Sequence, residues 1–227
     1  QVVKVILRAL SDKRLAVRYA SGFDAVWFPV FRWLLSDDIY DFFLKRMYRR
    51  FANAGSRSRE PFQPNRAARL TASSRGSFRK VVLITGASSG FGFAAANILA
   101  HRGYRVYATY RNPKRLKALQ ALSREEDVHP LFVETTDTQS VEKAVKTLLQ
   151  KEERIDVLIN NAGFAMGGFL EDMSDQDLKD QFDTNLFGYI RAVRAVAPIM
   201  RRQRSGQIIN VGSISGRIAV PALGAYV

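Results

Sequence analysis

An apolar run that leads into a glycine-rich turn is the feature that most constrains the fold of this chain. Residues 81–92 read VVLITGASSGFG, with three glycines spaced G-x-x-x-G-x-G. A run rich in β-branched residues is typical of a buried parallel strand, and glycines after it permit a sharp turn and a close approach of the backbone to a ligand. The segment therefore predicts a strand, a turn and a helix over about 90–102, whose first amide groups can hold a phosphate.

The chain continues this alternation of strands and helices beyond the glycine turn. Parallel strands joined by helices form right-handed crossovers, so we predict an α/β fold with a doubly wound parallel sheet of the Rossmann type, truncated at its C-terminal end. Further strands are expected at 105–110, 130–135, 156–163 and 206–213, and further helices at about 113–122, 140–153, from 174 onward and 186–203.

Two segments of different composition precede residue 80. Residues 1–51 mix apolar, aromatic and charged residues, with a helix expected over about 36–51, and we interpret them as a helical extension that packs on another surface. A helix lying on a membrane surface is one alternative, and a stretch foreign to the domain is another. Residues 52–79 are rich in Arg, Ser, Ala, Asn and Pro, which predicts a basic flexible linker.

The positive charge of the chain is concentrated in one segment. Of the net charge of +14, residues 49–80 contribute nine basic residues against one acidic residue. The overall basicity is therefore no sign that the whole protein binds nucleic acid, and the aromatic residues of this segment are not interleaved in a way that supports base stacking.

The chain has no cysteine, and His101 and His129 lie far apart, so no metal is expected. We expect a cytoplasmic protein, and in the alternative in which residues 1–51 lie on a membrane surface, the association is expected to be peripheral.

Further motifs follow the glycine turn in a fixed order. NNAG occupies Asn160–Gly163 at the end of a predicted strand, Asn185 lies in DTNLFG, Ser213 lies in NVGSISG, and Tyr226 follows Ser213 by 13 positions. With these motifs, residues 80–227 resemble the short-chain dehydrogenase/reductase family of oxidoreductases, which move a hydride to or from a nicotinamide cofactor. The tyrosine of that family opens a Tyr-x-x-x-Lys motif, and its lysine would fall just beyond the end of this sequence.

The resemblance implies roles for the residues of the later motifs. Hydride transfer to a carbonyl leaves an alkoxide that must gain a proton, and Tyr226 would supply it as the general acid, or act as the base in the reverse direction. Ser213 would donate a hydrogen bond to the substrate oxygen, and Asn185 would position a water that feeds a proton relay. A catalytically incomplete dinucleotide-binding module, without the lysine, is the alternative.

The same resemblance implies a cofactor site around the glycine turn. Members that prefer NAD place an acid at the end of the second strand, whereas here Arg111 follows that strand and can hold a 2′-phosphate, so NADP is expected rather than NAD. Glu134 stands where the family often has an aspartate near the adenine. The expected cofactor-binding residues are Thr85, Gly86, Ser88, Ser89, Gly90, Phe91, Gly92, Arg111, Glu134, Asn160, Asn161, Ala162 and Gly163.

The expected substrate is a small alcohol or carbonyl compound. The segments VYATYRNPKRL and GFAMGGFLEDMS look like those of members that act on steroids, retinoids and related lipophilic carbonyls. Because family members are often dimers or tetramers, a homo-oligomer is expected of the complete protein.

Besides the oxidoreductase and the incomplete dinucleotide-binding module, a third hypothesis makes residues 1–79 a segment that attaches the protein to a membrane or to nucleic acid.

Overall fold

The computed structural model describes residues 2–11, 79–218 and 221–226. In this part of the chain, five strands form one sheet in the spatial order β3-β2-β1-β4-β5, and every neighbouring pair is parallel. The predicted α/β fold with a parallel sheet is therefore confirmed. The strands are β1 (Val81–Ile84), β2 (Arg105–Tyr110), β3 (Val128–Phe132), β4 (Val157–Asn160) and β5 (Gln207–Asn210).

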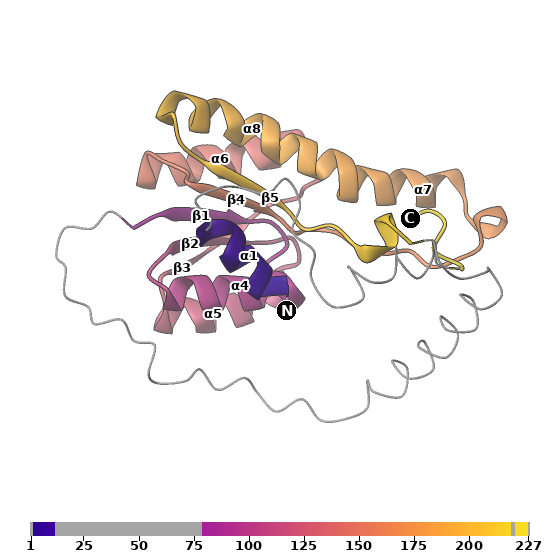
Figure 1. The fold of residues 1–227 in the computed structure, drawn as a ribbon, viewed down its shortest axis with the longest axis horizontal. Coiled ribbons are helices and arrows are strands. Elements are labelled where there is room, and N and C mark those ends of the chain that lie inside the picture. The colour runs from indigo at the N-terminus through magenta and orange to yellow at the C-terminus, as the bar shows by residue number, and fades with distance from the viewer. Residues whose placement is uncertain (1, 12–78, 219–220, 227) are drawn as a thin grey trace. The chain divides into compact units, whose positions relative to one another are not determined.

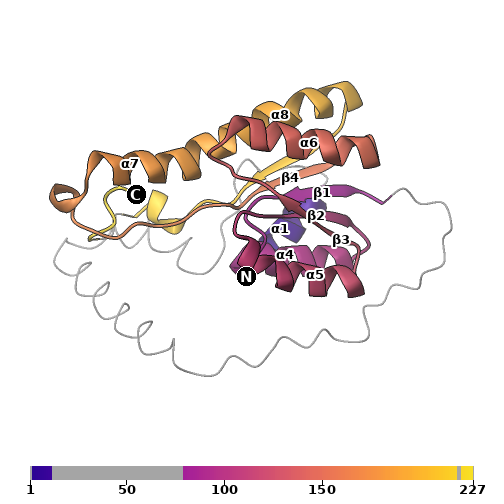
Figure 2. The ribbon, with the colours of Figure 1, turned by 180° about the vertical axis from the view of Figure 1, so that it is seen from behind.

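Helices cover both faces of this sheet. The described α-helices are α1 (Val2–Ser11), α4 (Gly90–His101), α5 (Leu116–Glu125), α6 (Thr138–Glu152), α7 (Asp175–Phe182) and α8 (Gly188–Gln203). Helices α4 and α5 lie on one face, and α6 and α8 lie on the other (Figures 1 and 2). The shorter helical turns are η2 (Pro113–Arg115), η3 (Leu170–Asp172), the π-helical η4 (Asp183–Phe187) and η5 (Ile214–Gly216).

The central strand β1 is buried on both of its faces. Successive side chains of a strand point to opposite sides, so Val82 and Ile84 join the apolar cluster that also contains residues of α4, whereas Val81 and Leu83 join the cluster that contains residues of α6 and α8. All four side chains are at most 3% exposed. This double burial explains why the sequence of β1 is continuously apolar rather than alternating.

The third strand differs from the prediction in its bounds. It covers 128–132 rather than 130–135, because its pairing with Val106–Tyr110 of β2 fixes where it begins and ends. The strand lies at the edge of the sheet, where Pro130, which has no N–H group, can be accommodated. The chain then leaves the ladder after one more hydrogen bond, from the Val133 N–H to the Tyr110 carbonyl at 3.0 Å.

The N-terminal helix α1 packs against the α/β core. Ile6 and Ala9 are each 4% exposed, and Ile6 belongs to the same apolar cluster as Val82 and Leu99. The Gln207 side chain of β5 donates a hydrogen bond to the Ala9 carbonyl at 2.7 Å. The helix predicted over 36–51 and the linker predicted over 52–79 lie outside the described residues except for Arg79, so the proposed domain division stays a prediction. None of the helices in the described ranges is long and apolar enough to cross a membrane.

Candidate functional site

The chain order of the strands reverses between β1 and β4, and the carboxyl ends of these two strands form the candidate site. The Thr85 N–H, just after β1, donates to the Ile159 carbonyl at 3.0 Å. In return, the N–H groups of Asn161 and Ala162 donate to the Thr85 hydroxyl at 2.9 and 3.1 Å. Buried Thr85 therefore holds the glycine turn against the NNAG segment. In open parallel sheets, ligands bind in the crevice outside the strands at this reversal point.

Two glycines of the turn lie where no side chain fits. A Cβ atom on Gly86 would lie 2.7 Å from the Ala162 Cα, and Gly86 has a φ of +64°. A Cβ atom on Gly92 would lie 2.5 Å from both the Asn161 side-chain nitrogen and the Gly86 carbonyl. Gly90 is different, because its φ is +59° and a Cβ there would have no atom within 4 Å. The turn is therefore tightly packed at Gly86 and Gly92 and open at Gly90. The open space leaves room for a ligand to approach the backbone.

The start of α4 lies next to this open space. Ser89 is the N-cap residue, yet its side chain makes no capping hydrogen bond, and Ser89, Gly90 and Phe91 are exposed. The first N–H groups of a helix have no acceptor within the helix, and they carry partial positive charge. Together with half-buried Ser88, these groups form a site at which a diphosphate can be bound.

The two asparagines of the NNAG segment bind neighbouring backbone and side chains. The fully buried Asn160 donates through Nδ2 to the Asn210 Oδ1 at 2.9 Å and so joins β4 to β5. Asn161 donates through Nδ2 to the carbonyls of Thr85 and Gly86 at 3.1 and 3.0 Å. Both side chains therefore support the shape of the site.

Arg111 and Glu134 meet just beyond β2 and β3. The Arg111 Nε lies 3.8 Å from the Glu134 Oε2, and the Arg111 side chain is 65% exposed. The other Glu134 oxygen accepts hydrogen bonds from the N–H and hydroxyl of Thr136 at 3.3 and 3.0 Å. At the end of β2, Thr109 accepts the Gly86 N–H through its hydroxyl at 3.0 Å and the Ala87 N–H through its carbonyl at 2.8 Å. Arg111 is therefore attached to the strand that also holds the glycine turn.

Asn185 lies in a π-helical turn that the sequence did not predict. Helix α7 continues through η4 directly into α8, whereas the pattern indicated a separate helix from 186. The Asn185 side chain forms two hydrogen bonds with the backbone of Phe164, immediately after the NNAG segment. Turns of the π type occur frequently at functional sites.

Ser213 and Tyr226 lie in the segments that follow β5. The exposed Ser213 caps η5, where its hydroxyl accepts the Ser215 N–H at 3.1 Å. Burial raises the pKa of Tyr189, in the first turn of α8, to about 12, and the charge of Tyr226 adds to this rise. The Tyr189 hydroxyl donates to the Val211 carbonyl at 2.9 Å, two residues before Ser213. Within residues 79–218 and 221–226, no hydrogen bond joins the side chains of Ser213 and Tyr226 directly.

One contact of the site was missed by the sequence analysis. Arg115 Nη1 donates to the Ser89 Oγ at 2.7 Å and so bridges η2 and the start of α4. The cluster of basic residues in RNPKR was the available signal, but spacing alone does not tell which of them turns back toward the glycine turn.

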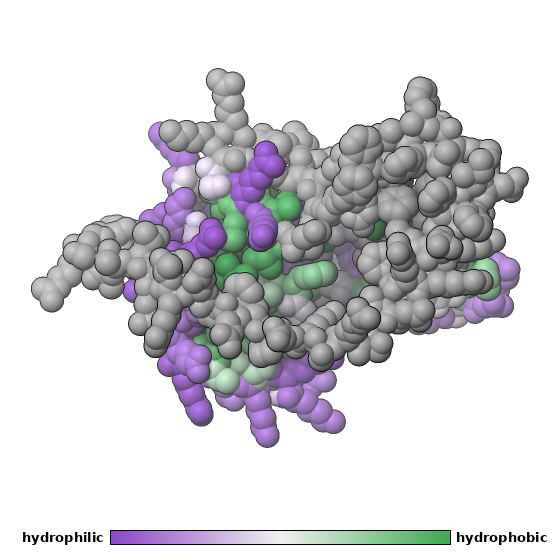
Figure 3. Space-filling model, turned by 60° about the horizontal axis from the view of Figure 1, so that its bottom comes forward, coloured by the Kyte–Doolittle hydropathy of each residue, from purple (hydrophilic) through white to green (hydrophobic). Residues whose placement is uncertain are grey.

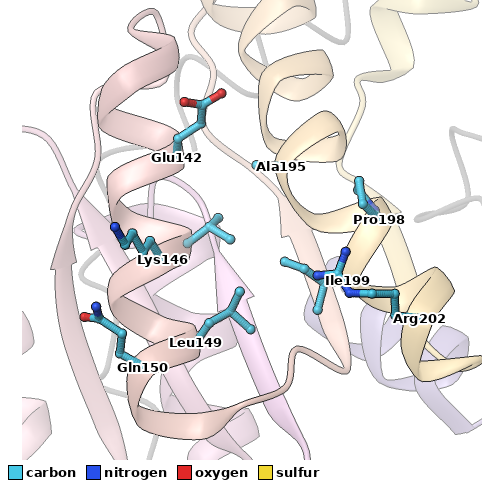
Figure 4. A pocket seen from close by; sticks show the side chains of 9 residues that line it. Glu142, Lys146, Leu149, Gln150, Ala195, Pro198, Ile199 and Arg202 are labelled. Atoms are coloured by element: carbon cyan, nitrogen blue, oxygen red, sulfur yellow. The ribbon is translucent and has the colours of Figure 1, made fainter.

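Two further surface features lie over the helices on either face of the sheet. A groove of about 520 Å³ lies between α6 and α8 (Figure 4), lined by Glu142, Val145, Lys146, Leu149, Gln150, Ala195, Pro198, Ile199 and Arg202. On the side of α4 and α5, hydrophilic side chains border a group of hydrophobic residues (Figure 3). Apolar atoms are common on protein surfaces, so neither feature is assigned a function.

The fold and the glycine turn together define a Rossmann-type, NAD(P)-binding α/β protein. Residues 80–227 match the family model described as short chain dehydrogenase. The chain therefore belongs to the short-chain dehydrogenase/reductase family, and the resemblance seen in the motifs is confirmed.

Named relatives and solved structures agree with this membership. The chain is 41% identical over 147 residues to a 3-ketodihydrosphingosine reductase of Bacteroides thetaiotaomicron, covering 65% of this chain and 52% of the relative. It is 39% identical over 140 residues to retinol dehydrogenase 8 of Homo sapiens, covering 60% of this chain and 45% of the relative. The chain thus spans about half the length of these curated relatives.

Two solved structures similar to this chain are described as complexes with a nicotinamide dinucleotide. An actinorhodin polyketide ketoreductase with NADPH has a TM-score of 0.63 and 29% identity, covering 65% of this chain and 58% of the other. A structure of ElxO with NADP bound has a TM-score of 0.62 and 28% identity, covering 65% of this chain and 61% of the other.

Proposed function

We propose that this chain is the cofactor-binding part of an NADP-dependent oxidoreductase that interconverts an alcohol and a carbonyl by hydride transfer. The observation that carries the proposal is the glycine turn beside the NNAG segment at the reversal point of the sheet, with open space over Gly90. The two similar structures described with NADPH and NADP support the choice of cofactor.

The residues present fit a dinucleotide. The tight packing at Gly86 and Gly92 fixes the turn, while the open space at Gly90 and the uncapped start of α4 leave the backbone N–H groups accessible to a diphosphate. Arg111 would bind the 2′-phosphate of NADP, and Glu134 would contact the adenine. When bound, the nicotinamide supplies or accepts the hydride.

The later motifs would supply the proton chemistry. Tyr226 would donate a proton to the carbonyl oxygen as reduction proceeds and accept it in the reverse direction. The exposed Ser213 hydroxyl would donate a hydrogen bond to the same oxygen and stabilise its developing charge. Asn185 fixes the backbone that follows the NNAG segment, which lies at the same end of the sheet.

A lipophilic substrate is the class that we favour. The relatives named above are, by name, a reductase of a sphingoid ketone and a retinol dehydrogenase. In this chain, Phe164, Phe169 and Leu170 follow the NNAG segment and are 37%, 57% and 54% exposed. This apolar surface beside the proposed reaction site would lower the free energy of binding of a hydrophobic alcohol or carbonyl.

The proposal is tested by measuring binding and then turnover with the purified protein. Calorimetric titration should detect NADPH binding, and NADPH oxidation should follow when long-chain ketones and retinoid aldehydes are added. Tyr226→Phe should keep NADPH affinity but lower kcat by about 10²- to 10⁴-fold, because only the proton donor is lost. Tyr104→Phe, which changes the same hydroxyl before β2, should leave kcat unaltered.

Three outcomes would contradict parts of this scheme. If neither NADPH nor NADH binds, the proposed function is wrong. If Tyr226→Phe turns over like the unmodified protein, Tyr226 is not the acid. If NADPH binds but no carbonyl is reduced, the chain is a dinucleotide-binding module without catalysis.

A further inference from the structure

Gln181 lies buried in the last turn of α7 and binds the loop of residues 164–169, which follows the NNAG segment. It is 1% exposed, and its Oε1 accepts the Met166 N–H at 2.6 Å. Its Nε2 has no hydrogen-bond partner among the described residues. Burying an amide group costs free energy that an apolar side chain of the same size would avoid. What Gln181 adds to the fold is therefore the position of the Met166 backbone.

Gln181 and Asn185 hold the same loop at two points. They lie four residues apart where α7 continues into η4, and they bind the backbones of Met166 and Phe164, which lie two residues apart. Four residues of a helix rise by about 6 Å, which is close to the length of about 6.6 Å that two residues of an extended chain span. The two side chains therefore match one extended segment and fix its register along the helix.

The same loop also holds the segment that leads to Tyr226, which lies beside α7 (Figures 1 and 2). The Gly168 N–H donates to the Ala222 carbonyl at 2.8 Å, and Gly168 forms a parallel β-bridge with Leu223. The Tyr226 N–H in turn donates to the Leu223 carbonyl at 2.9 Å. A continuous series of contacts therefore leads from Gln181 through the loop to the backbone of Tyr226.

We propose that Gln181 is a positioning residue for Tyr226, because it fixes the loop that holds the Tyr226 segment; this inference rests on the proposed function. Proton transfer requires the phenol to lie within hydrogen-bond reach of the substrate oxygen, and a displacement of about 1 Å can lower the rate by about 10²-fold. Among the described residues, the Gln181 side chain forms no hydrogen bond with Tyr226. Gln181 therefore acts through the loop and not on the substrate.

The experiment replaces Gln181 by methionine, which has a similar length but is only a weak hydrogen-bond acceptor. In the purified Gln181→Met protein, amide hydrogen exchange should become faster at Gly168 and over residues 221–226, while NADPH affinity measured by calorimetry stays unchanged. With a long-chain ketone as substrate, kcat should fall by about tenfold or more, because the proton donor is displaced. Gln181→Glu should restore part of both losses, since a carboxyl oxygen can accept the same N–H.

The matched control is Gln176→Met, which changes an exposed glutamine of the same helix and should alter neither hydrogen exchange at Gly168 nor kcat. The inference is overturned if Gln181→Met matches the unmodified protein in either measurement, or if Gln181→Glu performs no better than Gln181→Met. Absence of turnover in the unmodified protein would instead contradict the proposed function. In that case, hydrogen exchange alone shows whether Gln181 holds the Tyr226 segment, and unchanged exchange in Gln181→Met overturns the inference.

Discussion

Asn185 and Phe164 are joined by a reciprocal pair of hydrogen bonds. The Phe164 N–H donates to the Asn185 Oδ1 at 3.0 Å, and the Asn185 Nδ2 donates to the Phe164 carbonyl at 2.7 Å. The Asn185 side-chain amide thus binds both backbone groups of Phe164, as the backbone of a neighbouring strand does in a sheet. It attaches the loop after the NNAG segment to the π-helical turn η4, and the position of that loop depends on it.

We expect Asn185→Ala to lower the free energy of unfolding by about 1–3 kcal/mol, because both polar groups of Phe164 lose their partner. Denaturant unfolding followed by circular dichroism measures the change. Gln176→Ala is the control, since the Gln176 side chain donates to the Asp180 carboxylate on the exposed side of α7. Equal stability of the two variants would show that the pair with Phe164 contributes nothing.

A methyl group at Gly92 should disturb the glycine turn directly. The added Cβ would lie 2.5 Å from the Asn161 side chain and the Gly86 carbonyl, and neither can move without breaking the hydrogen bonds between the two loops. We expect Gly92→Ala to cost about 1–3 kcal/mol of stability and to weaken NADPH binding. Gly216→Ala, where a Cβ meets nothing within 4 Å, is the matched control for both measurements. An unchanged Gly92→Ala protein would contradict the close packing.

Helix α1 should contribute to the stability of the α/β core. Ile6 is 4% exposed and packs with residues of the sheet and α4. Ile6→Ala should lower the free energy of unfolding by about 2–5 kcal/mol, as for other buried isoleucines. Lys4→Ala, at an exposed position of the same helix, should have little effect. If both variants unfold alike, α1 does not pack on the core in solution.

A pH dependence is expected from Asp127. Its burial acts to raise the pKa, but hydrogen bonds from Arg79, His129 and Arg105 outweigh burial and hold the pKa below its ordinary value. A carboxylate with a lowered pKa in the folded state stabilises the protein above its ordinary pKa near 4, and this contribution is lost as the pH falls further.

Asp127→Asn should therefore be less stable than the unmodified protein at pH 7, and the difference should shrink below about pH 4. Thermal unfolding at a series of pH values measures it. The control is Glu125→Gln, which removes the negative charge of an exposed side chain nearby in the sequence. A difference that stays constant down to pH 3 would contradict this account.

The sequence predicted the central part of the fold well, because its signals are local. Twelve consecutive residues contain the apolar run of β1, the three glycines and the start of the next helix. Each of these signals supports the interpretation of the other two, and the structure contains all three features. The bounds of β3 were predicted less well, since an edge strand with a proline takes its limits from its pairing with β2.

Contacts between distant segments were not predictable in the same way. The pair of Arg115 with Ser89, the pair of Asn160 with Asn210, and the pair of Gln207 with Ala9 join residues 26, 50 and 198 positions apart. Nothing in a local pattern specifies which partner a long side chain will reach. The π-helical turn at Asn185 was also not predicted, since the sequence pattern indicated a separate helix from 186.

The amino-acid sequence by itself determined the order of strands and helices, the glycine turn and the family, because each depends on the conformational preferences of residues close together in the chain. Only the tertiary structure decided that β1 lies between β2 and β4, which brings the glycine turn and the NNAG segment to one edge of the sheet. That outcome depends on burying both faces of β1 at once, and this burial is achieved only when segments far apart in the sequence pack together.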